Sequence, residues 1–296
     1  MPNFSSEWES VNCHLCGRGQ NQAEPVLLSG APLTTGQFGF EIHPVICPCG
    51  LVYLNPRWTA ERYDEFYTHR YDALYRLEIK PDYGKEGVRK HMSQVWERIK
   101  PILTNRSPVK TVLDAGCGSG HGLGYLKEEL PDIDIFGIEA SAECCRILQE
   151  EVGATLLGRD INGRWLADNQ RRFDLIIMRH VAEHFLTPIE SLNRLRGTLA
   201  NGGLIYIAVP DMMHPRTVLR DYDKWWEYWF RTVHTHYYSK ETLFATLAKV
   251  GLSPLAWGED NQEVWCLADT TAPPWPPENN LFTAQSRLLT QLLPTT

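Results

Sequence analysis

Four cysteines form the first group of residues whose types and spacing are suited to chemistry. They stand in two pairs, and a glycine follows each pair directly: Cys13, Cys16, Cys47 and Cys49. Four thiolates supplied by two tight turns are typical of a tetrahedral Zn²⁺ site, and a site closed by four protein ligands leaves no position for a substrate. The pattern therefore predicts a structural zinc, with His14 or His43 as an alternative to one of the thiolates.

A glycine turn forms the second group. The segment DAGCGSG, from Asp114 to Gly120, follows a predicted strand and precedes a predicted helix, so its backbone can pass close to a ligand at a helix N-terminus. The next predicted strand ends at Glu139, where a carboxylate can accept hydrogen bonds from both hydroxyls of a ribose. No Gly-Lys-Ser/Thr follows the turn, which excludes a phosphate-binding P-loop. Asp114 would place a negative charge where a pyrophosphate must sit, so we expect a ligand that is cationic at this end.

Histidines and a glutamate form the third group. His180-x-x-Glu183-His184 follows a predicted strand, where open parallel sheets place ligand-binding groups. An imidazole that titrates near neutral pH can remove a proton, so we expect His180 to be a general base, with His234 and His236 as rivals. The alternative is that Glu183 and His184 only cap and orient the loop. The string also matches inverted zinc proteases, but those need both histidines on a long helix, whereas His180 ends a strand.

The elements that must position these groups alternate between strand and helix from Thr111 onward. Strands are expected at 111–116, 133–140, 154–158, 173–180 and 204–210, and helices at 122–129, 142–152, 188–199 and 240–250. Segments 252–257 and 264–268 are expected to form a closing hairpin-like pair. This order predicts an α/β fold with a Rossmann-like sheet that is parallel except for one antiparallel edge strand.

The chain divides by composition into four parts. We expect a zinc-ribbon-like unit at 1–56, a helical connector and lid at 57–108 and the sheet domain at 109–270, of which 211–238 is an insertion lining an acceptor pocket. A Pro-rich linker and a helix occupy 271–296, and this helix is expected either to pack back on the chain or to mediate self-association into a homo-oligomer.

Composition and net charge narrow the classes of partner that the protein can bind. The chain has 296 residues and a net charge of −7, which argues against a sequence-independent grip on nucleic acid. No apolar run approaches the roughly 18 residues of a membrane helix, and the first residues lack the pattern of a signal peptide. We therefore expect a cytoplasmic protein with a small-molecule partner and no membrane or nucleic-acid partner.

Five motifs in order, VLDAGCGSG, IFGIEAS, GRDI, FDLIIMRHVAEHF and LANGGLIYIAVP, make residues 90–270 resemble the class I S-adenosylmethionine-dependent methyltransferases. The resemblance implies that S-adenosylmethionine is the cofactor and that the following residues hold it. The methionine part would lie on Asp114, Gly116, Cys117, Gly118 and Gly120, the ribose on Glu139 beside Ala140, the adenine on Asp160 and Ile161, and the sulfonium near Arg179 and His180.

The N-terminal cysteines resemble those of a subset of these methyltransferases found in sugar and natural-product biosynthesis, which carry CxxC and then CxxCG-L-V-x-L-N-P-R. Here ICPCGLVYLNPR lacks one residue within the second pair. The resemblance implies methyl transfer to a small polar acceptor, a hydroxyl of a sugar or natural-product intermediate, with carbon methylation as an alternative. A non-enzymatic alternative is a zinc module that recruits a nucleic acid or protein beside a scaffold domain.

Some relatives, the ubiquinone-pathway O-methyltransferases and the small-RNA 3′-end methyltransferases, carry a similar E-x-x-E-H string and imply a second divalent metal. The ligands here would be His180, Glu183, His184 and His236, with His180 in place of the first glutamate. Two aromatic segments are candidates for the walls of the acceptor pocket, or else for ordinary buried and solvated helices: 225–230 and 57–76.

Overall fold

The computed structural model describes residues 7–76, 84–104, 106–168, 170–212, 226, 229–260, 263–273 and 281–292. Most of the predicted 211–238 insertion lies outside these residues, including Trp225 and Tyr228 of the aromatic run, and so does most of the Pro-rich linker. Of that run the structure describes Trp226, Trp229 and Phe230. No helix in the described ranges is both long enough and apolar enough to span a bilayer.

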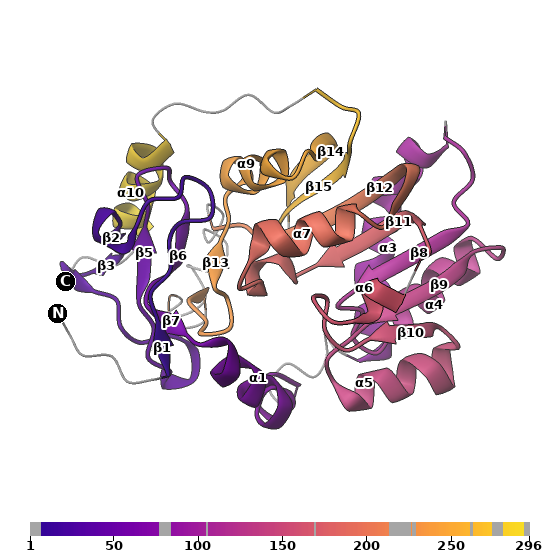
Figure 1. Ribbon diagram of the computed structural model, residues 1–296, viewed down its shortest axis with the longest axis horizontal. Helices are drawn as coiled ribbons and strands as arrows, with labels where there is room; N and C mark the ends of the chain where they lie inside the picture. Colours follow the sequence, from indigo (N-terminus) through magenta and orange to yellow (C-terminus); the bar gives the residue numbers. More distant parts are fainter. Residues whose placement is uncertain are drawn as a thin grey trace.

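A seven-stranded sheet with the order β10-β9-β8-β11-β12-β15-β14 forms the centre of the molecule (Figure 1). Its strands are β8 (Thr111–Ala115), β9 (Asp134–Ile138), β10 (Thr155–Gly158), β11 (Phe173–Arg179), β12 (Leu199–Pro210), β14 (Ser253–Asp260) and β15 (Glu263–Asp269). All neighbours pair in parallel except β15, which is antiparallel to both β12 and β14. The predicted α/β fold is confirmed. Its antiparallel strand lies one place inside the edge, because the hairpin after β14 returns β15 alongside β12.

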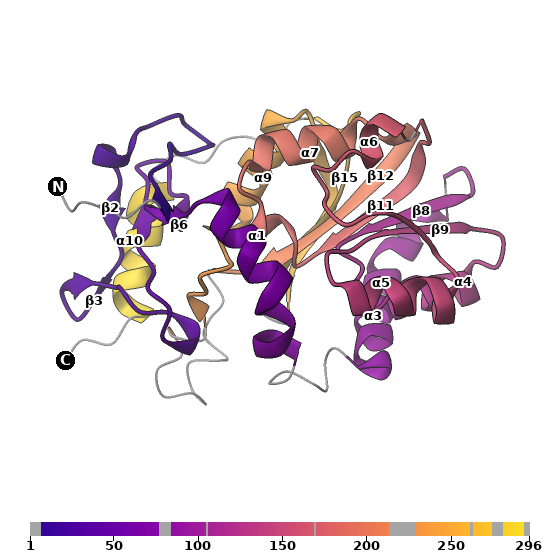
Figure 2. The same cartoon turned by 60° about the horizontal axis from the view of Figure 1, so that its bottom comes forward.

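Helices cover both faces of this sheet, which explains why its central strands are apolar without alternation. The helices are α3 (Lys85–Leu103), α4 (His121–Glu129), α5 (Ala142–Ile147), α6 (Trp165–Asp168), α7 (Pro188–Arg196) and α9 (Lys240–Lys249), and a π-helical turn, Leu148–Val152, continues α5. One core joins α3 and α4 to the sheet, and a second core joins α6, α7 and α9 to the opposite face (Figure 2). The carboxyl ends of the parallel strands therefore form one edge, where ligands bind in such sheets.

The N-terminal segment builds a separate four-stranded antiparallel sheet with the order β13-β6-β5-β2. Its strands are β2 (Glu24–Pro25), β5 (Pro44–Ile46), β6 (Val52–Leu54) and β13 (His236–Tyr237). Strand β13 comes from the chain beyond β12, so residues distant in sequence complete this sheet (Figure 1). Smaller pieces are β1 (Trp8–Glu9) paired with β7 (Arg57–Trp58), β3 (Leu27–Leu28) paired with β4 (Ala31–Pro32), and the 3-10 helices Gln20–Gln22 and Gln37–Gly39.

Two further helices adjoin the N-terminal unit: α1 follows it in the chain, and α10 packs against it. Helix α1 (Ala60–His69) begins where Thr59 caps its first turn, and a π-helical turn at Asp72–Arg76 follows it. Helix α10 (Leu281–Leu292) packs back on the N-terminal unit, where Leu289 joins its apolar core. Gln285 also donates from Nε2 to the Ser239 hydroxyl at 2.6 Å. The N-terminal sheet is thus held by the C-terminal helix as well as by β13.

Candidate active site

The glycine turn follows β8 and ends at Gly120, the residue directly before α4, as the sequence predicts. Gly116, Gly118 and Gly120 all have positive φ, a backbone conformation that side chains with a Cβ rarely adopt. A Cβ on Gly116 would lie 2.4 Å from a methyl carbon of Val181, so the turn also packs tightly against the loop after β11. The turn is therefore fixed both by its backbone and by its neighbours.

Glu139 follows β9, and its carboxylate faces this turn. Oε2 accepts a hydrogen bond from the Gly118 amide at 2.9 Å, and Oε1 accepts one from the Ser141 amide at 2.8 Å. The next residue, Ala140, is exposed, and its carbonyl accepts from Nε of Arg159 at 3.0 Å. These contacts place the Glu139 carboxyl group and the glycine turn side by side, an arrangement that can hold a ribose.

Asp114 is only 7% exposed. Burial and the nearby charge of Glu139 together raise the pKa of its carboxyl to about 7, although Arg179 opposes the shift. Because a buried carboxylate without a compensating cation is costly, a cationic ligand beside Asp114 would favour its ionised form. The expectation of a cationic ligand at this end thus rests on the burial of Asp114 as well as on its position.

The remaining predicted cofactor residues lie in the glycine turn and directly after β10. Cys117 is buried, and its Sγ would lie 2.6 Å from a Cβ placed on Gly137. Asp160 is exposed after β10, where it accepts from the Asn162 amide at 2.9 Å, and the carbonyl of Ile161 accepts from the indole of Trp165 at 3.0 Å. Asp160 is therefore exposed to solvent in the turn after β10.

Glu263 is a site residue that sequence reasoning missed. It begins β15 opposite Pro210, so the antiparallel strand delivers it to the carboxyl end of β12. Its buried carboxylate contacts two arginines and a histidine: Arg98 at 2.6 Å, Arg179 at 2.9 Å and His180 at 2.9 Å. Burial alone would raise the pKa of Glu263, but these partners outweigh it and hold the pKa well below its usual range. No local signal marks this residue, because only strand pairing brings it to the site.

His180 lies between two carboxylates. Its Nε2 is 2.9 Å from Glu263 and its Nδ1 is 3.6 Å from Glu183, and its backbone φ of 54° is unusual for a residue other than glycine. Burial and Arg179 lower the pKa of His180, yet the two carboxylates outweigh them and raise it. Each ring nitrogen of His180 therefore faces a carboxyl group, and this arrangement favours the protonated form of the ring.

His184 has the opposite environment. Burial lowers its pKa, and the His234 ring stands edge-on to it with ring centres 4.9 Å apart. Nδ1 of His184 is 2.9 Å from the Tyr67 hydroxyl, and Nε2 is 3.8 Å from Glu183. Burial also lowers the pKa of His234 well below its usual value. Both rings are therefore neutral at neutral pH, the state in which an imidazole accepts a proton.

Glu183 is 1% exposed, and neither of its carboxylate oxygens has a hydrogen-bond partner within the described part of the chain. One ligand atom each of Glu183, His184 and His234 lie within 4.8 Å of one another. His236 lies elsewhere: its ring stands 4.7 Å from that of His14, and its Nδ1 is 2.9 Å from the Thr235 hydroxyl. The structure thus groups His234, and not His236, with Glu183 and His184.

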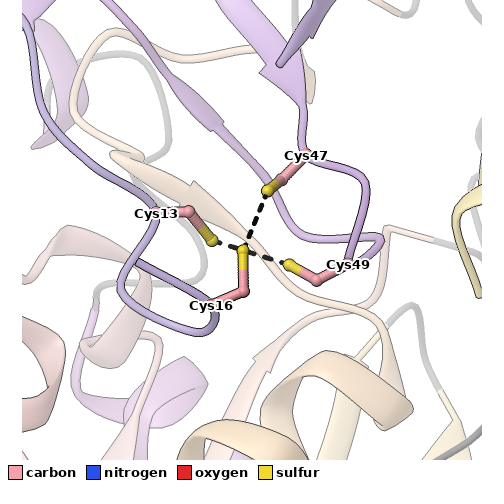
Figure 3. A group of neighbouring side chains, drawn as sticks. All are labelled: Cys13, Cys16, Cys47 and Cys49. Carbon is pink, nitrogen blue, oxygen red and sulfur yellow. Dashed lines mark hydrogen bonds between the residues drawn. The ribbon is translucent and has the colours of Figure 1, made fainter. Parts of the chain in front are cut away.

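The four predicted zinc ligands converge between the two turns that carry them (Figure 3). Sγ of Cys13 lies 3.6 Å from that of Cys49, Sγ of Cys16 lies 3.3 Å from that of Cys47, and all four sulfurs are within 4.8 Å of one another. The alternative ligands have other partners, because Nε2 of His14 is 2.9 Å from Thr246 Oγ1 and Nε2 of His43 is 3.0 Å from a Glu41 oxygen. Four sulfurs at these separations fit tetrahedral zinc.

Residues 88–256 match the family described as Methyltransferase domain. A ubiquinone biosynthesis O-methyltransferase of Roseobacter denitrificans is 32% identical over 34% of this chain and 42% of its own length. A trans-aconitate 2-methyltransferase of Rhodopseudomonas palustris is 26% identical over 52% of this chain and 50% of its own length. The chain thus spans about half or less of the length of these curated relatives.

Solved structures share the fold. A plantazolicin methyltransferase in complex with a pentazolic desmethylPZN analogue and S-adenosylhomocysteine matches with a TM-score of 0.53 and 20% identity, over 78% of this chain and 88% of its own. A magnesium protoporphyrin IX methyltransferase from Synechocystis with bound S-adenosylhomocysteine matches with a TM-score of 0.52 and 14% identity, over 71% of this chain and 99% of its own.

Proposed function

Because this chain belongs to the class I S-adenosylmethionine-dependent methyltransferases, we propose that it methylates a hydroxyl of a small polar molecule, with a neutral histidine as the general base. The residues present fit the cofactor: a buried carboxylate at Asp114 suits its cationic methionine end, and Glu139 beside the glycine turn suits its ribose. Asp160 and Ile161 would hold the adenine. When bound, the cofactor supplies an electrophilic methyl group on a cationic sulfur.

The chemical class of the methyl acceptor is inferred from the N-terminal unit. Its cysteine turns and the GLVYLNPR stretch are similar to those of sugar and natural-product methyltransferases, and we assign a sugar or natural-product intermediate as the acceptor. The four cysteines hold a structural zinc in this proposal, because a site with four protein ligands offers no position to a substrate. We propose a biosynthetic role on the same ground.

The observation that carries the base assignment is the contrast between His180 and His184. Carboxylates flank both nitrogens of His180 and raise its pKa, whereas burial lowers the pKa of His184, which lies beside a buried Glu183. His180 instead fixes Glu263 and the end of β11. We therefore assign proton removal to His184, with His234 beside it as the alternative base.

The test uses S-adenosylmethionine with a labelled methyl group and a panel of nucleoside-diphosphate sugars and hydroxylated carboxylic acids. We expect label in at least one panel compound and turnover lowered about 10²- to 10⁴-fold by His184→Asn, with unchanged S-adenosylhomocysteine affinity. A matched His234→Asn variant separates the two neighbouring rings. Normal turnover of His184→Asn with loss in His234→Asn would move the base to His234, and no labelled compound would reject this acceptor class.

Metal-dependent O-methyl transfer is the second candidate. It is favoured by the grouping of Glu183, His184 and His234, and by the absence of hydrogen-bond partners for the Glu183 oxygens among the described residues. Turnover that a chelator abolishes while the zinc of the cysteine site stays bound would support it. Turnover that persists under those conditions would reject it.

A further inference from the structure

The N-terminal half of the chain supplies one side chain to the histidine cluster. Tyr67 lies on α1, and its hydroxyl is 2.9 Å from Nδ1 of His184. Five residues later, Asp72 accepts a hydrogen bond from the hydroxyl of Ser141 at 2.9 Å, and the Ser141 amide bonds Glu139. The segment from α1 to Asp72 therefore spans from the histidine cluster to the ribose side of the cofactor site, between the N-terminal sheet and α5 (Figure 1).

Three neighbouring side chains in this region include one that is fully buried and two that are partly exposed. Glu183 is fully buried, the His184 side chain is 19% exposed, and Tyr67 is half-buried at the outer end. A Glu183 oxygen lies 3.8 Å from Nε2 of His184, which is beyond hydrogen-bond distance, so Nε2 faces this carboxyl group without bonding to it. When the ring proton is on Nε2, the lone pair of Nδ1 faces the Tyr67 hydroxyl and accepts a hydrogen bond from it. An acid, an imidazole and an outer hydroxyl in this order reproduce the logic of a catalytic triad.

Resting on the proposed methyl transfer, we propose that Tyr67 is a catalytic residue that removes the acceptor proton through this relay. The acceptor hydroxyl gives its proton to Oη of Tyr67 while the Tyr67 proton moves to Nδ1 of His184. The acceptor oxygen keeps the electron pair of its O–H bond for its new bond to the methyl carbon. The imidazolium that forms lies beside the carboxylate of Glu183, and the proton later leaves to solvent.

The relay assigns Tyr67 a role that a structural tyrosine of the same helix lacks. Tyr63 lies one turn earlier on α1, is buried, and donates to the carbonyl of Thr232 at 2.9 Å. It therefore makes a hydrogen bond of the same kind and length without contacting His184. Tyr63→Phe and Tyr67→Phe remove one hydroxyl each from one helix and form a matched pair.

The experiment is nitrogen NMR of the full chain with ¹⁵N-labelled histidine and bound S-adenosylhomocysteine, with His184→Gln used to assign the signals. We expect the neutral wild-type ring to carry its proton on Nε2, with Nδ1 as a hydrogen-bond acceptor. Tyr67→Phe is expected to shift the Nδ1 resonance, and Tyr63→Phe to leave it in place. A proton on Nδ1 in the wild type, an ion bound to the ring, or an Nδ1 resonance unmoved by Tyr67→Phe would overturn the relay.

The kinetic readout uses the panel compound that the wild-type protein methylates fastest. We expect Tyr67→Phe to lower kcat about 10²-fold or more and to leave KM for S-adenosylmethionine unchanged, whereas Tyr63→Phe changes kcat little. Equal kcat in wild type and Tyr67→Phe would overturn the proposal. If no panel compound is methylated, the proposed function fails, while the NMR experiment still reports whether the relay exists.

Discussion

The carboxylate of Glu263 lies 2.9 Å from Nε2 of His180, although the two residues are 83 positions apart in the chain. This contact joins the last strand of the central sheet to the end of β11, and Arg98 of α3 joins it from a third element. The buried carboxylate therefore fixes three elements at the site edge and helps to raise the pKa of His180.

Glu263→Gln is expected to lower the free energy of unfolding by about 3 kcal/mol or more, because it leaves buried cations without their counter-charge. Since the folded pKa of Glu263 is depressed, its contribution is fully present above the ordinary carboxyl pKa and is lost as pH falls through the folded value. Urea unfolding at pH 7 measures the difference. Asp260→Asn removes an exposed partner of the same Arg98 and should cost about 1 kcal/mol or less; equal losses in both variants would contradict the account.

The affinity for S-adenosylhomocysteine is expected to rise about tenfold between pH 6 and pH 8. The raised pKa of Asp114, about 7, means that its carboxyl ionises over this range, and only the ionised form attracts the ammonium group of the ligand. The same shift predicts that the ligand-free protein loses stability as pH rises from about 4 to 7, where the unfolded but not the folded carboxyl is ionised. Calorimetry on the Asp114→Asn variant provides the control. If the affinity of this variant for S-adenosylhomocysteine still rises with pH, a group other than Asp114 is responsible.

Glu139→Ala is expected to weaken S-adenosylhomocysteine binding by about 1 to 3 kcal/mol, because charge-assisted hydrogen bonds to the ribose are lost. Isothermal titration measures this directly. Glu143→Ala removes an exposed carboxylate from the first turn of α5 and should bind normally. Unchanged affinity in Glu139→Ala would remove this residue from the cofactor site.

Cys16→Ser is expected to lose the bound zinc and to become less soluble, because three sulfurs no longer close the tetrahedral site. Metal content per chain, measured by plasma emission, is the readout. Cys144→Ser alters a buried thiol outside the cluster and should keep its zinc. Full zinc content in Cys16→Ser would show that this cysteine is not a ligand.

The features set by local spacing could be predicted from the sequence. The glycine turn, Glu139 and the two cysteine turns each depend on a few neighbouring residues, and the structure places them as expected. The largely parallel sheet followed from the alternation of strands and helices, but the position of its antiparallel strand one place inside the edge did not.

The contacts of Glu263 and Tyr67 could not be predicted, because strand pairing and helix docking between distant segments create them. The same limit applies to the histidines after β12. β13 pairs with β6 of the N-terminal unit, and this pairing turns His236 toward His14 while His234 stays beside His184. His234 and His236, which are two positions apart, therefore lie in different regions of the protein, and their spacing in the sequence does not reveal this.

The most direct test of the central claim is a native mass spectrum of the intact chain with S-adenosylhomocysteine, before and after the His184→Asn substitution. We expect one zinc and one cofactor per chain, with both retained in the variant, because the base acts without a metal. A second ion that His184→Asn removes would contradict a histidine base and establish a metal at Glu183, His184 and His234.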